Sequence, residues 1–181
     1  MSRIQPIDPA RATGKAAELL SAVQKKLGVT PNMMRTMASS PAVLDAYLAF
    51  SGALAGGSLS AKLREQIAVT VAEANRCDYC LAAHHAIGAR VGLSPRDLEL
   101  ARSADAADAK AKAVLVLARA VAKKHGEVSD ADVASARAAG LSDGELAEVV
   151  ANVALNAFTN SFNHFAATEV DFPAVSPALA R

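Results

Sequence analysis

An all-α fold, built as a bundle of many helices, is predicted by three features of this 181-residue sequence. Alanine, which has the highest intrinsic helix propensity, accounts for 43 residues. Aromatic residues make up only 4% of the chain and runs of β-branched residues are few, so strands would be poorly supported. Helix start and stop signals divide the chain into short segments. One domain is expected over residues 1–181, with an N-terminal helical segment over 1–57 and a core over 58–181.

Capping residues and helix breakers set the bounds of the first helices. Gly28 ends the first one, because glycine readily adopts the left-handed conformation that closes many helices. Pro31 and Pro41 open the next two, since proline is well tolerated in the first helical turn. The run Gly56 to Ser58 then separates them from a long helix that starts at about Ser60. The helices expected in this half are, in order, about 8 or 13 to 28, a short one from 31, 42–55, 60–75 and 78–91.

Serine residues mark the start of later helices. Ser94 is followed three residues on by Asp97, and Ser142 is followed three residues on by Glu145. Each pair can form a capping box, in which two free backbone N–H groups at the helix start are satisfied by side-chain oxygens. The helices expected in this half are about 94–103, 108–125, 129–139 and 142–168.

Charge and hydropathy exclude several classes of partner. The chain has 19 Lys and Arg against 18 Asp and Glu, for a formal net charge of +1. These basic residues are scattered, which argues against nucleic acid or an anionic membrane as a partner. No apolar run approaches the roughly 20 residues that span a bilayer. The N-terminal sequence does not resemble a secretory signal, so the expectation is a cytoplasmic protein with reduced cysteines.

The residues that can carry chemistry gather in the stretch 64–85, which holds both cysteines of the chain. Cys77 and Cys80 are three residues apart at the start of a predicted helix. There they can share a face, form a disulfide and gain thiolate character from the helix N-terminus. His84 lies one turn beyond Cys80 on the same face, where its imidazole can accept the thiol proton. This spacing is typical of a redox-active dithiol.

Glu65 joins this group only if the chain folds back on itself. On one straight helix it would lie about 18 Å from Cys77. A turn at residues 75–77, followed by an antiparallel helix, would instead place His84 one turn from Glu65. The carboxylate could then orient the imidazole and raise its basicity. The sequence therefore predicts an antiparallel helix hairpin that holds a relay from Glu65 through His84 to Cys80, with Cys77 as the resolving thiol.

Two other interpretations of the dithiol stay open at this point. The cysteines could be inert buried side chains, although a chain with only two cysteines, spaced C-x-x-C, makes a redox role the better hypothesis. Alternatively, Cys77 and Cys80 could hold a metal together with His84 or His85. A structural zinc site usually draws its second ligand pair from a distant segment, so no metal and no cofactor are expected here.

Two further polar features also have alternative explanations. Glu65 on its own could be a solvated helix charge paired with Lys62 or Arg64, so its role depends on its neighbours. Asn160, Asn163 and His164 form a polar patch on an otherwise apolar helix. Such a patch either makes buried hydrogen bonds or forms the lip of a pocket.

The run of Glu65, eleven residues, Cys77, two residues, Cys80, three residues and His84 resembles the core motif of alkylhydroperoxidase D-like proteins, in the carboxymuconolactone decarboxylase superfamily. In that family, the cysteine that matches Cys80 is the peroxidatic thiol, activated by the residues that match Glu65 and His84. The cysteine that matches Cys77 resolves the sulfenic acid. A position between the cysteines that is histidine in some members is Tyr79 here, so an additional proton relay through it is not expected.

The resemblance extends beyond the motif. Residues 30–33, 163–164 and 171–173 are similar to the longer, peroxidase-related branch of the family. This branch implies an all-helical subunit that assembles into a homo-oligomer. The decarboxylase members of the superfamily lack the dithiol, so carboxymuconolactone decarboxylation is disfavoured.

The expected function is a thiol-dependent peroxidase. The Cys80 thiolate would attack a hydroperoxide, become a sulfenic acid, and condense with Cys77 to a disulfide. An external thiol reductant, dihydrolipoamide-like or thioredoxin-like, would then reduce this disulfide. Two alternatives use the same residues: a disulfide reductase that serves a peroxiredoxin, and a non-enzymatic redox sensor or oligomeric scaffold whose dithiol switches assembly.

Overall fold

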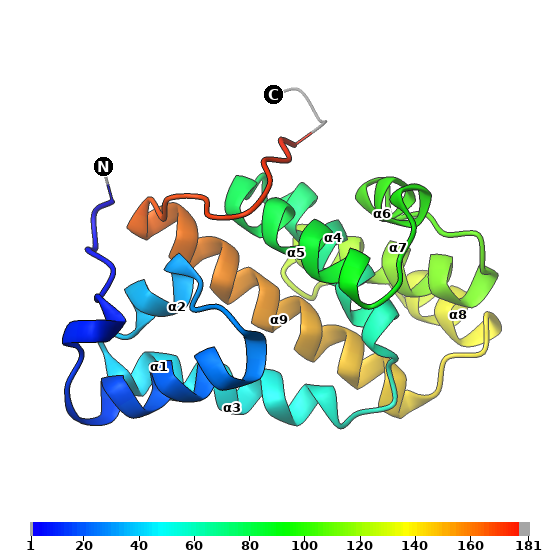
Figure 1. The fold of residues 1–181 in the computed structure, drawn as a ribbon. Coiled ribbons are helices and arrows are strands. Elements are labelled where there is room, and N and C mark those ends of the chain that lie inside the picture. The colour runs from blue at the N-terminus through cyan, green and yellow to red at the C-terminus, as the bar shows by residue number, and fades with distance from the viewer. Residues whose placement is uncertain (1, 178–181) are drawn as a thin grey trace.

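The computed structural model describes residues 2–177, and within them it confirms the all-α class (Figure 1). The described elements are η1 (Pro9–Arg11), α1 (Gly14–Leu27), α2 (Asn32–Met37), α3 (Pro41–Ala55), α4 (Ala61–Ala74), α5 (Asp78–Arg90), α6 (Pro95–Arg102), α7 (Ala109–Lys124), α8 (Asp130–Ala138) and α9 (Asp143–Ala166). The predicted bounds of the longer helices differ from these by no more than two residues, apart from the alternative start of the first helix at residue 8, which lies before η1 and six residues before α1.

Local capping explains this agreement. Gly28 closes α1 with a φ of 76°, a left-handed conformation that glycine adopts without steric cost. Ser94 and Ser142 form the expected capping boxes with Asp97 and Glu145. Because these caps act through backbone conformation or through hydrogen bonds to residues three or four positions away, the sequence signal and the structural outcome are closely linked.

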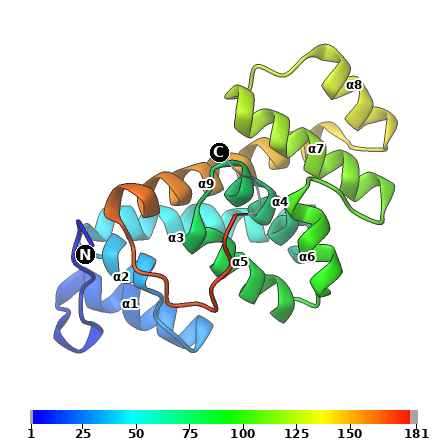
Figure 2. The same ribbon diagram turned by 90° about the horizontal axis from the view of Figure 1, so that it is seen from above.

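Two helices organise the bundle. α4 lies at its centre, packed against α5, α6, α7 and α9. α9 is the longest helix; it runs along the molecule and contacts α3, α4, α5 and α7 (Figure 1). α1 and α2 lie at one end, and α7 and α8 lie at the other (Figure 2). Residues of α9 therefore face both the N-terminal helix α3 and the α4–α5 hairpin.

One apolar core joins these elements. The N-terminal helices contribute Leu20, Met37 and Leu44 to the same cluster that holds Ile67 of α4 and Leu115 of α7. Each of these five side chains is at most 2% exposed. Burial of a side chain of this size stabilises the folded state by about 1.5 to 3 kcal/mol. None of the helices in residues 2–177 is both long and apolar enough to cross a lipid bilayer.

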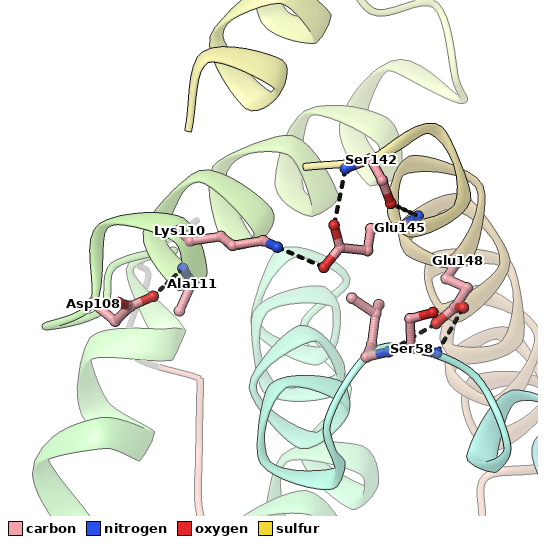
Figure 3. Close-up of polar contacts among 8 residues, drawn as sticks. Ser58, Asp108, Lys110, Ala111, Ser142, Glu145 and Glu148 are labelled. Carbon is pink, nitrogen blue, oxygen red and sulfur yellow. Dashed lines mark hydrogen bonds and ion pairs between the residues drawn. The ribbon is translucent and has the colours of Figure 1, made fainter. Parts of the chain in front are cut away.

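Two carboxylates in the first turns of α9 connect this helix to neighbouring segments (Figure 3). Glu148 accepts hydrogen bonds from the backbone N–H groups of residues 58–59, at 2.8 and 2.9 Å. Glu145 pairs with the ammonium group of Lys110 on α7, at 2.7 Å. A Cβ atom on Gly57 would lie 2.6 Å from Oε2 of Glu148, so a side chain there would displace the carboxylate. The loop that leads into α4 is thereby held against α9.

Candidate active site

The α4–α5 hairpin brings Glu65 and His84 into contact. After α4 ends at Ala74, Arg76 adopts a left-handed φ of 57° and Cys77 caps α5, so the chain reverses within a few residues. Oε2 of Glu65 then lies 2.7 Å from Nδ1 of His84. The two side chains are 18% and 21% exposed, so water screens their interaction only weakly. The antiparallel hairpin predicted from the sequence is present.

The hydrogen bond to the carboxylate assigns the two ring nitrogens of His84. A carboxylate accepts, so Nδ1–H donates to Glu65 and Nε2 is left for proton exchange. Burial disfavours the imidazolium ion, but the charge and the hydrogen bond of Glu65 outweigh that effect and raise the pKa of His84 above its ordinary value. His84 can therefore hold a proton near neutral pH and deliver it from Nε2.

Both cysteines lie in the first turn of α5 with free thiols, and they are only 1% and 2% exposed. Cys77 is the N-cap residue, and its Sγ accepts a hydrogen bond of 3.3 Å from the backbone N–H of Cys80. The pair is therefore held at the positive end of the α5 dipole, where a thiolate is favoured.

The surroundings move the pKa values of the two thiols in opposite directions. The hydrogen bond from Cys77 lowers the pKa of Cys80 to about 7; burial opposes this change, and His84, Asn163 and Asn160 assist it. Donation of that same hydrogen bond, together with burial, raises the pKa of Cys77. Cys77 therefore keeps its proton, while Cys80 is divided between thiol and thiolate at neutral pH.

Asn163 of α9 is the part of the polar patch that reaches the thiols. Its Nδ2 lies 3.3 Å from Sγ of Cys80 and 3.2 Å from Sδ of Met33, and the residue is 4% exposed. His164, the next residue of α9, is exposed, and its Nε2 lies 3.0 Å from the backbone oxygen of Asn75. Asn163 thus makes the buried contacts considered for the patch, whereas His164 faces solvent, and neither residue is among those that line the cavity next to Cys80.

The second histidine of the hairpin points away from the dithiol. His85 lies near Glu73, Glu99 and Arg102, and burial is the main reason that its pKa is lowered. Among residues 2–177, no group of three or more His, Cys, Asp and Glu side chains is arranged to hold a metal ion.

A cavity of about 520 Å³ opens onto Cys80. Glu65, His84 and Tyr47 also line it, whereas Cys77 is not among the lining residues. A reagent that enters the cavity therefore meets Cys80 first. Part of the wall comes from the C-terminal segment, where Phe172 packs edge-on against Tyr79 with 5.8 Å between the ring centroids.

Tyr47 is a pocket residue that sequence reasoning did not identify. In the sequence it is one of several apolar residues at helical spacing in α3, and nothing distinguishes it from a core residue. Burial, with the nearby charges of Glu65 and Cys80, raises the pKa of Tyr47 to about 12. Its phenol is therefore protonated at neutral pH and can donate a hydrogen bond inside the pocket.

We expect the rate of iodoacetamide alkylation at Cys80 to reach half its maximum near pH 7. Only the thiolate reacts, so the rate should fall about tenfold for each pH unit below that midpoint. Asn163→Ala should move the midpoint upward, because it removes a donor to the sulfur. Tandem mass spectrometry of the 77–90 peptide separates the two cysteines. A midpoint near the ordinary cysteine value of about 8.5 would contradict this assignment.

Comparisons with known proteins agree with this architecture. Residues 41–124 match the carboxymuconolactone decarboxylase family. A peroxidase-related protein from Silicibacter sp. TM1040 shares 25% sequence identity over 92% of each chain, with a TM-score of 0.80. A peroxidase-related protein from Ralstonia eutropha JMP134, described as an alkylhydroperoxidase AhpD core, shares 27% identity. That alignment covers 94% of this chain and 92% of the other, with a TM-score of 0.84.

The same fold occurs in a protein with another activity. The debrominase Bmp8, solved as a variant in complex with 2,3,4-tribromopyrrole, has a TM-score of 0.81 over 94% of this chain and 92% of its own. Its sequence identity is 18%, so this likeness concerns the fold alone. No curated protein sequence matches this chain.

Proposed function

Because this chain belongs to the carboxymuconolactone decarboxylase superfamily, as an AhpD-like protein, we propose that it is a thiol-dependent peroxidase that reduces organic hydroperoxides. One observation carries the proposal. Cys80 faces the pocket with a pKa of about 7, beside an imidazole that is hydrogen-bonded to a partly buried carboxylate. The relation to peroxidase-related and AhpD-like proteins supports an antioxidant enzyme. The reaction of the two thiols with a hydroperoxide is what we propose in addition.

In the first step, the Cys80 thiolate attacks the terminal oxygen of the hydroperoxide. A sulfur–oxygen bond forms and the oxygen–oxygen bond breaks, so the thiolate is oxidised to a sulfenic acid and the peroxide is reduced. The alkoxide that leaves takes a proton from Nε2 of His84 and departs as an alcohol. Glu65 supports this step because its negative charge stabilises the imidazolium ion beforehand.

In the second step, Cys77 resolves the sulfenic acid. Its sulfur attacks the Cys80 sulfur, the disulfide forms, and hydroxide leaves with the proton of Cys77 as water. The short link between the residues favours this reaction, since both sulfurs lie in the first turn of α5. The raised pKa of Cys77 suits a resolving thiol that stays protonated until this step.

The external reductant would have to reach the disulfide through the pocket. Cys80 lines the cavity while Cys77 is 1% exposed, so the incoming thiolate would attack the Cys80 sulfur and release Cys77. This access favours a slender dihydrolipoamide-like donor over the folded surface of a thioredoxin-like protein. We place the reaction in the cytoplasm, where thiol donors are kept reduced.

We also propose that the subunit assembles with further copies of itself. Val150, Phe158 and Phe165 are 49%, 41% and 66% exposed. Their spacing puts them on one side of α9, which makes an apolar strip that a second subunit could cover. Light scattering of the native protein measures this assembly.

Steady-state turnover tests the proposed function. With cumene hydroperoxide and a panel of dihydrolipoamide, thioredoxin and glutathione, we expect many turnovers and the highest rate with dihydrolipoamide. Oxidised protein without donor should be lighter by two hydrogens, with Cys77 and Cys80 joined within one chain.

Other outcomes of this assay identify the alternatives. Consumption of one peroxide per subunit without further turnover would indicate a sensor. Turnover that requires an added peroxiredoxin would indicate a disulfide reductase.

A further inference from the structure

Three cationic side chains line the active-site pocket without a carboxylate partner. Lys26, Arg64 and Arg90 all contribute to its lining. Within residues 2–177, none of them takes part in an ion pair. Arg64 donates one hydrogen bond to a backbone carbonyl, which leaves its charge uncompensated. Glu65, the single carboxylate among the described lining residues, is already bound to His84.

The hairpin register places two of these cations near each other. A Cβ atom on Gly88 would lie 3.9 Å from Cβ of Glu65, so the start of α4 lies beside the last turn of α5. Arg64 is therefore level with the turn that holds Arg90. Arg90 is ten residues beyond Cys80, or about 15 Å along the helix axis. Positive charge thus gathers at the end of α5 that is distant from the reactive thiol.

Lys26 adds a third positive charge to the lining from α1. It lies in the last turn of α1 and is exposed, as is Arg90, whereas Arg64 is partly buried. Charges at the solvent-facing side of a cavity with low-dielectric walls attract an oppositely charged ligand and raise its association rate. The ligand expected from this pattern carries a negative group that stays near the surface.

The rest of the lining favours an apolar ligand body. Ile87 lies on α5 between His84 and Arg90, and it faces the same cavity. Other apolar side chains reach it from the N-terminal helices: Val23, Leu27, Met34, Leu48 and Leu54. A cavity of about 520 Å³ with such walls can enclose most of a molecule of moderate size.

We propose that the pocket selects hydroperoxides with an apolar body that ends in a negatively charged group, as in hydroperoxides of long-chain carboxylic acids. The peroxide group meets Cys80, and the carboxylate lies toward Arg64, Arg90 and Lys26. The reaction part of this inference rests on the proposed peroxidase function. The binding part rests only on the charge and shape of the pocket.

A pair of substrates that differ only in charge tests the selection. We expect kcat/KM to be about tenfold higher for linoleic acid hydroperoxide than for its methyl ester, and the ratio to shrink at high salt. Arg90→Glu should bring the ratio close to one. Lys123→Glu makes the same charge change on α7, at an exposed residue outside the pocket, and should leave the ratio as it is in the unaltered protein.

Binding without turnover separates this proposal from the peroxidase proposal. In Cys80→Ser, a fluorescent long-chain carboxylic acid such as parinaric acid should bind about tenfold more tightly than its methyl ester. The added Arg90→Glu change should remove that difference. This result would support the selection even in a protein that reduces no peroxide. Equal binding of acid and ester in Cys80→Ser, or equal kcat/KM values in an active enzyme, would overturn it.

Discussion

Replacement of Cys80 by serine is expected to abolish peroxide turnover, with a loss on the order of 10⁴-fold or more, because the nucleophile is removed. The serine hydroxyl is not oxidised by hydroperoxides and is not ionised near neutral pH. The substitution changes one buried atom and keeps the first turn of α5, so the fold should be retained. Steady-state peroxide consumption with dihydrolipoamide measures the loss, and circular dichroism checks the fold.

Cys77→Ser is the matched control, since it removes the other thiol of the same turn. This variant should consume about one peroxide per subunit and then stop, because no resolving thiol remains. Its Cys80 sulfenic acid should react with dimedone, and excess peroxide should oxidise it further to sulfinic acid. If Cys80→Ser instead accumulated a sulfenic acid on Cys77, the two roles would be reversed.

The second large effect is expected at Glu65. Glu65→Gln keeps the size of the side chain but removes its charge, so the pKa of His84 should fall toward its ordinary value. Less imidazolium would then be present at neutral pH, and the pKa of Cys80 should rise, since His84 helps to lower it. Turnover should drop by roughly 10² to 10⁴, as for loss of an acid–base group. His84→Gln should have a similar effect.

A double-mutant cycle shows whether these two residues act as one unit. If they do, Glu65→Gln combined with His84→Gln should be little worse than the poorer single variant. Glu127→Gln, which changes an exposed carboxylate outside the pocket, serves as the control and should retain full activity. Losses that multiply in the double variant would mean independent roles. Full activity of Glu65→Gln would mean that its contact with His84 is structural.

Local signals in the sequence were enough to predict the helices and one face of the candidate site. Gly28, Ser94 and Ser142 act through backbone conformation or hydrogen bonds within three residues, so their effect does not depend on the rest of the fold. Cys80 and His84 lie four residues apart on a single helix, and helix geometry alone puts them on one side.

The contact between Glu65 and His84 could be predicted only in part from the sequence. Its prediction required the chain to reverse at residues 75–77 and the following helix to run back antiparallel. The distance of 2.7 Å depends on how α4 and α5 pack together. Gly88 marks the closeness of this packing, because an added Cβ there would lie 3.9 Å from Cβ of Glu65 on α4.

The environment of the thiols was decided by tertiary structure alone. Asn163 reaches Cys80 from 83 residues away, and Tyr47 reaches the pocket from a helix that the sequence marks only as apolar. Likewise, the spacing of the cysteines does not say which of them faces the cavity. A periodic pattern indicates which face of a helix is buried but not which helix covers it. That choice depends on the packing of α3 and α9 around the hairpin, where contacts between distant segments determine the partners of each side chain.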